Sequence, residues 1–237
     1  MNEFDIRHTI RMTVFMTLVM PLVALKYAFA AEAPCGKQPQ GEPSATAWVL
    51  SANTEAVCVY THAAGNSNIH EIKAEATLAA SPTSIFSVIA DYGRYPEFMP
   101  YVKTSEVIKS AEDTSWVFQQ LALPFPVSDR YYTIRLVADK HLASPGSYRV
   151  DWTLAGPEVP GRTGSGVPLL INTGYWKLQP VDEGKGTHVT YFIHTDPGGA
   201  LPAWVINIAN KEAAPSVVKA VRTRVVAHGT NSPDPKQ

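Results

Sequence analysis

Val189-Thr190-Tyr191-Phe192-Ile193-His194-Thr195-Asp196-Pro197-Gly198-Gly199-Ala200-Leu201-Pro202 is the stretch that decides the fold of this chain. Its first half alternates apolar residues at Val189, Tyr191 and Ile193, which predicts a strand with one buried face. The Pro and Gly residues that follow predict a turn. Pro202 suits the first turn of a helix, where no amide hydrogen is needed.

The residues after this turn predict a long amphipathic helix. Its apolar residues recur at three- and four-residue spacings: Leu201, Trp204, Val205, Ile208, Ala209, Val217, Val218, Val221 and Val225. Such a stripe must be covered by another element, and a sheet face is the natural cover. Pro215 lies inside the pattern and predicts a kink or a split near Ala213–Ala214.

Composition favours one globular domain without a nucleic-acid partner. Hydrophobic residues make up 45% of the 237 residues, enough for a substantial core. The formal net charge is −1 and there is no basic run, which argues against nucleic acid or an anionic membrane surface as the main electrostatic partner. The chain has no Cys-x-x-Cys, and its His residues are scattered. We therefore predict no metal and no cofactor.

The amino terminus has the pattern of an export signal. Arg7 and Arg11 precede the apolar run Met12–Leu25, and Ala28-Phe29-Ala30 supplies a cleavage pattern. This predicts a signal peptide over 1–30 and a periplasmic or secreted protein. An uncleaved membrane anchor is the alternative, although the apolar run is shorter than the ~20 residues that a spanning helix needs.

Both cysteines, Cys35 and Cys58, fall in the predicted mature chain. An oxidising compartment favours a disulfide between them, and two unpaired thiols are the alternative.

The rest of the chain divides into a flexible lead (31–44), a folded domain (45–228) and a disordered tail (229–237). A helix is predicted to start at Ser81-Pro82 and to end by Tyr92-Gly93. Strands are predicted over 47–51, 56–62, 69–78, 102–109, 114–123, 130–137, 147–154, 174–179 and 187–195. This order is typical of an α+β fold with an antiparallel sheet.

The central strands allow the two faces of the sheet to be sorted. Pairing 130–137 with 147–154 places Leu136 opposite Val150, Ile134 opposite Trp152, Tyr132 opposite Leu154 and Arg135 opposite Asp151. Extending the pattern to 114–123 places Gln120 beside Tyr132, Phe118 beside Ile134 and Trp116 near Leu136. One face then gathers these apolar residues, interrupted by Gln120. A buried amide needs a hydrogen-bond partner, so a polar ligand group or an internal water is expected there.

Several motifs together resemble the START lipid-transfer domains of the helix-grip superfamily. The motifs are Trp48-Val49-Leu50, Val57-Cys58-Val59-Tyr60, Ile69–Thr77 leading into Ser81–Asp91, Val127-Ser128-Asp129-Arg130, Gly174-Tyr175-Trp176-Lys177-Leu178-Gln179-Pro180 and the run Thr187–Trp204. The resemblance covers 45–226. Two departures are Arg130-Tyr131, where the family often has Arg-Asp, and Val167-Pro168-Leu169-Leu170, where it often has an Arg. The segment Asp91–Pro100 is also similar to the coenzyme Q-binding and polyketide-cyclase branches.

The resemblance implies a helix-grip fold, in which a curved antiparallel sheet wraps around the long C-terminal helix and encloses an apolar cavity. It also implies a non-enzymatic protein that binds one lipid (a sterol, hopanoid, fatty acid, phospholipid or quinone), with transient membrane contact. The ligand-binding residues implied are Trp116, Phe118, Gln120, Arg130, Tyr132, Ile134, Trp152, Trp176, Trp204 and Ile208.

Other readings stay open at this point. Trp152, Ile134 and Trp204 are equally suited to filling a core. A cyclase or hydrolase is the alternative function, with Tyr132 and His194 as an acid/base pair, and a quinone-binding protein or a peptide-binding groove are further ones. The final helix and the loop Gly156–Pro168 are expected to form the gate through which a ligand enters the cavity.

Overall fold

The computed structural model describes Cys35 and residues 47–65, 67–140, 142, 144–159 and 161–230. The predicted signal peptide, most of the predicted lead and the residues beyond 230 lie outside the described residues. The elements in chain order are β1 (Val49–Thr54), β2 (Val57–His62), β3 (Glu71–Leu78), α1 (Pro82–Ile89), η1 (Tyr92–Arg94), α2 (Tyr95–Phe98), β4 (Val102–Ala111), β5 (Thr114–Leu121), β6 (Arg130–Asp139), β7 (Tyr148–Leu154), β8 (Val167–Pro168), β9 (Ile171–Val181), η2 (Asp182–Gly184), β10 (Gly186–Asp196) and α3 (Ala203–Thr230).

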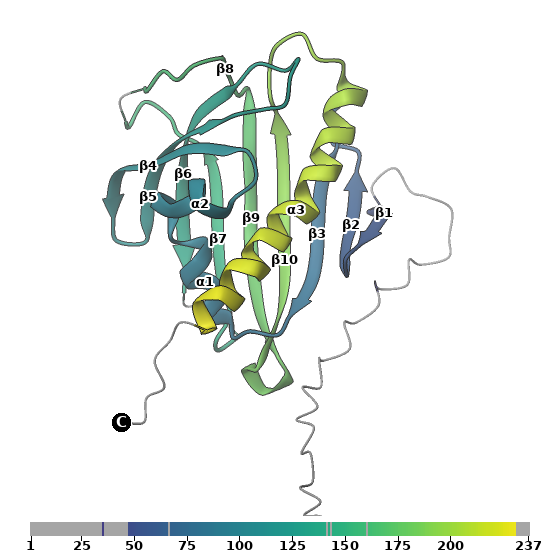
Figure 1. Ribbon diagram of the computed structural model, residues 1–237, viewed down its shortest axis with the longest axis vertical. Coiled ribbons are helices and arrows are strands. Elements are labelled where there is room, and N and C mark those ends of the chain that lie inside the picture. Colours follow the sequence, from purple (N-terminus) through teal and green to yellow (C-terminus); the bar gives the residue numbers. More distant parts are fainter. Residues whose placement is uncertain are drawn as a thin grey trace, which may run out of the picture.

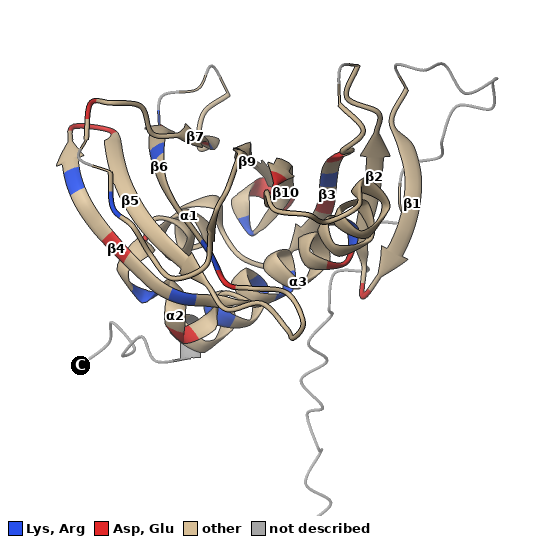
Figure 2. Ribbon diagram, turned by 90° about the horizontal axis from the view of Figure 1, so that it is seen from above, with Lys and Arg blue, Asp and Glu red and all other residues tan. Residues whose placement is uncertain are grey.

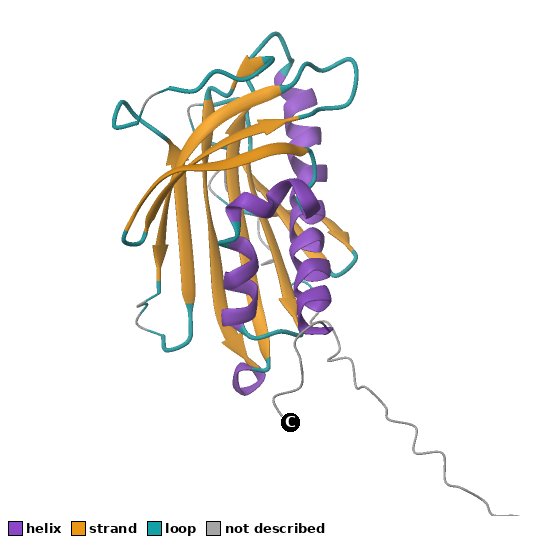
Figure 3. Cartoon of the chain, turned by 60° about the vertical axis from the view of Figure 1, so that its left-hand side comes forward, coloured by secondary structure: helices purple, strands orange, loops and turns teal. Residues whose placement is uncertain are grey.

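Ten strands of the described chain form one curved sheet in the order β1-β2-β3-β10-β9-β7-β6-β5-β4 (Figure 1). The pairs in this order are antiparallel, and the short β8 adds a parallel pairing to β6. Figure 3 shows the sheet curving around α3, with α1 beside it on the same side. The α+β helix-grip architecture predicted from the sequence is confirmed. Along β4, basic and acidic residues alternate (Figure 2).

The start of α1 is fixed by local chemistry. The Ser81 hydroxyl accepts a hydrogen bond from the Ser84 amide at 3.2 Å, and Pro82 occupies the first turn. Ile85, Val88 and Ile89 are buried on one face. α1 therefore starts where the Ser-Pro signal predicted, and its buried face packs against the rest of the domain.

The long strands β9 and β10 form the middle of the sheet. Tyr191 pairs with Trp176, and Thr195 pairs with Asn172. Along β9, the buried positions alternate from Asn172 through Gly174 and Trp176 to Leu178. Because side chains alternate between the faces of a strand, these four belong to the concave face beneath α3.

α3 packs its second half tightly on the concave face. Ala214, Val218 and Val221 are at most 1% exposed. The helix continues through Pro215 instead of splitting there. Packing of the residues on either side offsets the loss of the one hydrogen bond that proline cannot donate.

The registers predicted for the central strands are wrong. Ile134 pairs with Leu154 and Leu136 with Trp152, a shift of two residues that leaves each side chain on its predicted face. The shift between β5 and β6 is one residue, since Gln119 pairs with Tyr132. A shift of one residue exchanges the faces of the strand. Trp116, Phe118 and Gln120 therefore lie on the convex face.

The physical reason is a segment, 155–168, that packs across the convex face of β5 and β6. Glu158 accepts a hydrogen bond from the Trp116 indole at 3.1 Å, and the Arg162 guanidinium lies 4.8 Å from the Phe118 ring centre. Ser165 is hydrogen-bonded to Gln120. We call 155–168, apart from the undescribed Pro160, the outer strap. Because it covers the convex face here, both faces of β5 are buried and its hydrophobic pattern does not mark the inner one.

Cys35 and Cys58 form the predicted disulfide, with their Cα atoms 5.6 Å apart. It joins the segment before the domain to β2. None of the helices in the described ranges is long and apolar enough to span a membrane.

Candidate functional site

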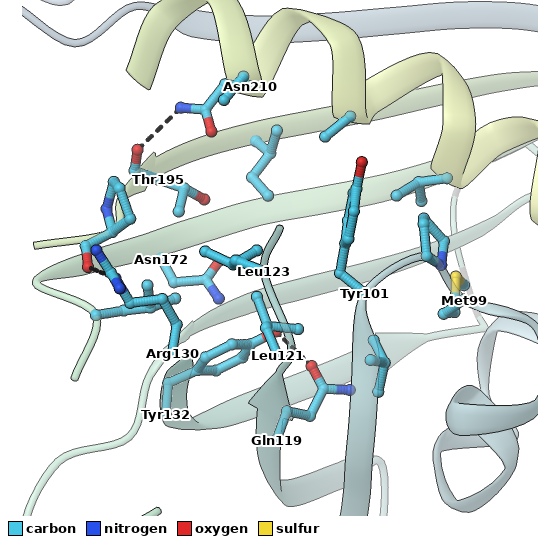
Figure 4. A pocket seen from close by; sticks show the side chains of 18 of the residues that line it. Met99, Tyr101, Gln119, Leu121, Leu123, Arg130, Tyr132, Asn172, Thr195 and Asn210 are labelled. Carbon is cyan, nitrogen blue, oxygen red and sulfur yellow. Dashed lines mark hydrogen bonds between the residues drawn. The ribbon is translucent and has the colours of Figure 1, made fainter. Parts of the chain in front are cut away.

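A cavity of about 520 Å³ lies between the concave face of the sheet and the first half of α3. Its size falls within the range typical of small-molecule sites. The wall is formed by the strands β5, β6, β7, β9 and β10, the segment from α1 to β4, the β5–β6 loop, Leu169 before β9, the β10–α3 linker and α3 (Figure 4). Helix and sheet leave this space because the side chains that α3 presents here, such as Ala209 and Ala213, are small.

The part of the cavity away from the loops is apolar and aromatic. Ile134, Leu136, Val150, Trp152 and Trp176 line it, and each is buried. The Tyr191 ring lies 4.5 Å from that of Trp176 and 5.8 Å from that of Trp152, centre to centre. These rings provide a large apolar surface with few rotatable bonds.

Gly174 makes room for this aromatic cluster. A Cβ atom at this position would collide with the Trp152 ring and with the Phe192 carbonyl. The Gly-x-Trp motif on β9 therefore has two roles in the cavity wall. Trp176 lines the cavity, and Gly174 leaves room for the Trp152 ring against the sheet.

Polar side chains cross the cavity wall closer to the loops. The Tyr132 hydroxyl donates to Gln119 Oε1 at 2.5 Å, and Gln119 Nε2 donates to Ser105 Oγ at 3.0 Å. Trp152 Nε1 donates to Asn172 Oδ1 at 3.0 Å. These bonds fix the orientation of each side-chain amide and leave the cavity with neutral polar groups.

Burial keeps the tyrosines of the cavity in their neutral form. Desolvation raises the pKa of Tyr132 and of Tyr191 above the usual range, and it raises the pKa of Tyr95 strongly. Tyr95 also donates its hydroxyl proton to the Ile89 carbonyl at 2.6 Å. At physiological pH these phenols are hydrogen-bond donors and carry no charge.

Arg130 is 3% exposed at the loop end of the cavity. Its Nε donates to the Pro197 carbonyl at 2.6 Å and Nη2 to the Gly198 carbonyl at 3.2 Å, while Nη1 donates to the Ser128 and Asp129 carbonyls. Desolvation lowers its pKa. The guanidinium thus connects the β5–β6 loop to the linker between β10 and α3, through main-chain acceptors on both sides.

The structure brings half of the predicted site residues together. Arg130, Tyr132, Ile134, Trp152 and Trp176 line the cavity. The others do not line it: Trp116, Phe118 and Gln120 lie under the outer strap, and Trp204 and Ile208 are 66% and 55% exposed on α3. The inner row of the helix instead begins with Val205 and Ile206.

Four polar residues of the wall were missed by sequence reasoning: Gln119, Asn172, Thr195 and Asn210. Gln119 was missed through the register error. Asn172 had a usable signal, because the alternation of Gly174, Trp176 and Leu178 extends back to it if the strand is started three residues earlier. Asn210 belongs to no apolar pattern in the sequence, and only the structure shows that it lines the cavity.

The predicted acid/base pair is not assembled. Thr195 and Tyr191 line the cavity, so His194, between them on β10, points to the convex face, away from Tyr132. None of the residues lining the cavity is His, Asp, Lys or Cys. Among the described residues, no group of three His, Cys, Asp or Glu side chains is arranged to hold a metal.

The mouth of the cavity lies at the β5–β6 loop and the start of α3, not at the outer strap. Phe125 lines the cavity and is 96% exposed, so the cavity reaches the surface there, opposite Leu201 and Pro197. No strap residue lines the cavity. The strap is held on the convex face and by the pairing of Val167 with Arg130. Its part in the gate stays a prediction.

The sequence and the fold are similar to those of several known proteins. An uncharacterised protein of Pseudomonas aeruginosa is 26% identical over 191 residues, which cover 77% of this chain and 89% of that protein. The phosphatidylcholine transfer protein of Bos taurus is 26% identical over 193 residues, which cover 78% of this chain and 87% of that protein.

Solved structures show the same fold. A STAR-related lipid transfer protein from Xanthomonas axonopodis is 28% identical, with a TM-score of 0.67 over 75% of this chain and 98% of that one. Human StAR-related lipid transfer protein 5 is 14% identical, with a TM-score of 0.69 over 77% and 88% of the two chains, and supports the fold alone. The family model described as polyketide cyclase / dehydrase and lipid transport matches residues 78–222, more than half of the chain. The chain therefore belongs to this family and has the fold of its START lipid-transfer branch.

Proposed function

We propose that this protein binds one hydrophobic, lipid-like molecule in the cavity under α3 and transfers it between membranes. The observation that carries the proposal is the cavity of about 520 Å³, walled by aromatic and branched side chains in a domain similar to lipid transfer proteins. An apolar space of this size is costly to leave filled with water, and a lipid tail gains free energy there in proportion to its buried area. The site residues proposed are those lining the cavity.

Transient membrane contact is proposed at the mouth. Phe125, Leu170 and Trp204 are 96%, 63% and 66% exposed, and the loops and helix turn that carry them lie at the loop end of the cavity. Large apolar side chains in water favour an apolar partner. Insertion of these side chains into a bilayer would place the mouth against the lipid.

Catalysis is the second candidate, because the family includes polyketide cyclases and dehydrases. The cavity favours binding instead: its ionisable side chains are five tyrosines, Arg130 and Glu212, and the guanidinium is engaged with main-chain carbonyls. A quinone remains among the ligands compatible with an apolar cavity.

Export of the protein is proposed together with this function. The Cys35–Cys58 disulfide supports it, since disulfides persist in oxidising compartments. Amino-terminal sequencing of protein from a cell-envelope fraction should find Ala31 at the start. An intact Met1 on cytosolic protein would contradict export.

The experiment that tests binding is native mass spectrometry and lipid extraction of the purified protein, followed by transfer of the extracted lipid from donor to acceptor phosphatidylcholine vesicles. We expect one lipid per chain and faster transfer in the presence of the protein. A protein that carries no lipid and leaves the transfer rate unchanged would contradict the proposal.

A further inference from the structure

Uncharged polar side chains form a row across the cavity wall, closer to its loop end. The row consists of Gln119 on β5, Tyr132 on β6, Asn172 on β9, Thr195 on β10 and Asn210 on α3, and we call it the polar belt. Gln119 pairs with Tyr132, and Asn172 pairs with Thr195. Figure 4 shows the five side chains around the same part of the cavity.

Most of the belt is held in place by hydrogen bonds within the protein. Tyr132 donates to Gln119, Trp152 donates to Asn172, and the Asn210 amide donates to the main-chain carbonyl of Thr195 at 3.0 Å. Since both Asn172 and Asn210 are fixed at one end, the other end of each amide is presented in a defined direction. A preorganised polar group of this kind binds a ligand with little loss of side-chain entropy.

Thr195 is the member of the belt that lacks a partner. Its hydroxyl oxygen is buried and makes no hydrogen bond with any residue that the structure describes. A buried hydroxyl without a partner is unfavourable. It lies directly across the strand pair from Asn172, so an oxygen atom placed beside this pair would give the Thr195 hydroxyl a partner and lie next to the Asn172 amide.

Apolar side chains make up most of the remaining wall. Ile134, Leu136, Trp176, Leu123 and Leu201 are among them. A ligand that reaches the belt therefore needs one polar group on an otherwise apolar body.

Charge at the belt favours a neutral ligand group. No member of the belt is ionised at neutral pH, and the acidic residue of the wall, Glu212, is exposed to solvent. Arg130, the cation of the wall, already donates four of its five N–H groups to main-chain carbonyls, which leaves one hydrogen on Nη2 for an anion and no bidentate site for a carboxylate or phosphate unless a carbonyl is displaced. A buried ion without a hydrogen-bonded partner is strongly disfavoured.

We propose that the cavity selects lipids whose polar group is an uncharged oxygen, a hydroxyl or a carbonyl, which binds between Thr195 and Asn172. This inference rests on the proposed lipid-binding function. It separates sterol-, hopanoid-, alcohol- or quinone-like ligands from fatty acids and from phospholipids with a buried phosphate.

Matched probes with one tail and different head groups test the proposal. Quenching or enhancement of Trp152 and Trp176 fluorescence reports binding of 1-tetradecanol, myristate and tetradecane at pH 8, where the carboxyl group is ionised. We expect the dissociation constant of the alcohol to be at least about tenfold lower than that of myristate and that of tetradecane. A tenfold difference corresponds to about 1.4 kcal/mol of binding free energy.

Variants at Thr195 test the assigned contact. Thr195→Val keeps the shape but removes a hydroxyl that has no protein partner, so the fold is retained, and the alcohol should lose about tenfold in affinity while tetradecane is unaffected. Thr195→Ser keeps the hydroxyl and should retain the preference.

The possible outcomes separate the two proposals. If myristate binds as tightly as the alcohol or more tightly, the proposed preference for an uncharged head group is wrong, while lipid binding itself still stands. The same holds if the Thr195→Val protein keeps its preference for the alcohol. Failure of all three probes to bind at any concentration would instead contradict the binding function itself.

Discussion

Trp152 donates its indole hydrogen to the side-chain oxygen of Asn172 at 3.0 Å, and both residues are at least 90% buried. This bond joins the aromatic part of the cavity wall to its polar part. It also fixes which end of the Asn172 amide faces the cavity.

Trp152→Phe should lower the free energy of unfolding by about 1–3 kcal/mol, because it leaves the buried Asn172 oxygen without its donor. Urea denaturation measures the change. Trp48→Phe, a change at a half-buried ring on the convex face, is the control and should cost less. Equal costs for the two variants would show that the hydrogen bond contributes little.

Ile134→Trp should block lipid uptake and leave the fold intact. Ile134 lines the cavity, so a larger ring can occupy space that the ligand would fill, whereas overpacking a filled core costs about 1–3 kcal/mol. Lipid content by native mass spectrometry and thermal unfolding are the measurements. Thr153→Trp, an exposed change on a neighbouring strand, should retain lipid. Normal lipid loading of the Ile134 variant would argue against a ligand at this wall.

Amide hydrogen exchange should slow across 200–214 when lipid binds. This half of α3 covers the cavity, and Ala209 and Ala213 on its inner row leave open space beneath it that a ligand would fill. The outer strap should exchange at the same rate with and without ligand, because its contacts lie on the convex face. Ligand-dependent protection confined to the strap would place the gate there instead.

Trp204→Asp should slow transfer between vesicles several-fold while leaving solution binding nearly unchanged. Trp204 is exposed on the first turn of α3 and does not line the cavity. Val226→Asp makes the same kind of change at the far end of the helix, where the side chain is 62% exposed, and should leave the transfer rate unaltered. If both variants transfer at the parental rate, the membrane contact is not at this turn.

Stability should fall as the pH rises above 10. Burial raises the pKa of Tyr92 to about 12 and that of Tyr132 and Tyr191 further, whereas phenols of the unfolded chain ionise near pH 10. The native state therefore holds more protons than the unfolded state above pH 10, and the free energy of unfolding falls by up to about 1.4 kcal/mol per pH unit for each such tyrosine.

Below pH 10 all these phenols are neutral in both states, and they add no slope. Urea denaturation across pH 8 to 11 measures the profile, and Tyr92→Phe should make the alkaline decline shallower. A profile as steep in the Tyr92→Phe protein as in the parent would show that this phenol ionises as easily in the folded state.

The strands, α1 and α3 were predictable because their signals are local. Ser81-Pro82 starts α1, and alternation along β10 and β9 marks their buried faces. The inner face of β5 was not predictable, since Trp116, Val117 and Phe118 are all buried and no alternation separates the faces. The outer strap, which buries this face, is polar and rich in Gly and Pro. Its own sequence therefore gives no signal that it packs on a sheet. The exposure of Trp204 and Ile208 was also not predictable, because it depends on which side of α3 faces the sheet at its first turns.

The acceptors of Arg130 are main-chain carbonyls on both sides of the mouth. A main-chain acceptor is present whatever side chain the residue carries. Ser128 and Asp129 can thus be exchanged in evolution or by design without loss of the bonds that unite the two rims, provided that the backbone path is kept. Gly198 and Gly199 are the restricted positions, because both have positive φ and a side chain at Gly199 would press on the guanidinium. The connection between the two rims therefore tolerates sequence change at Ser128 and Asp129 and restricts it at the two glycines.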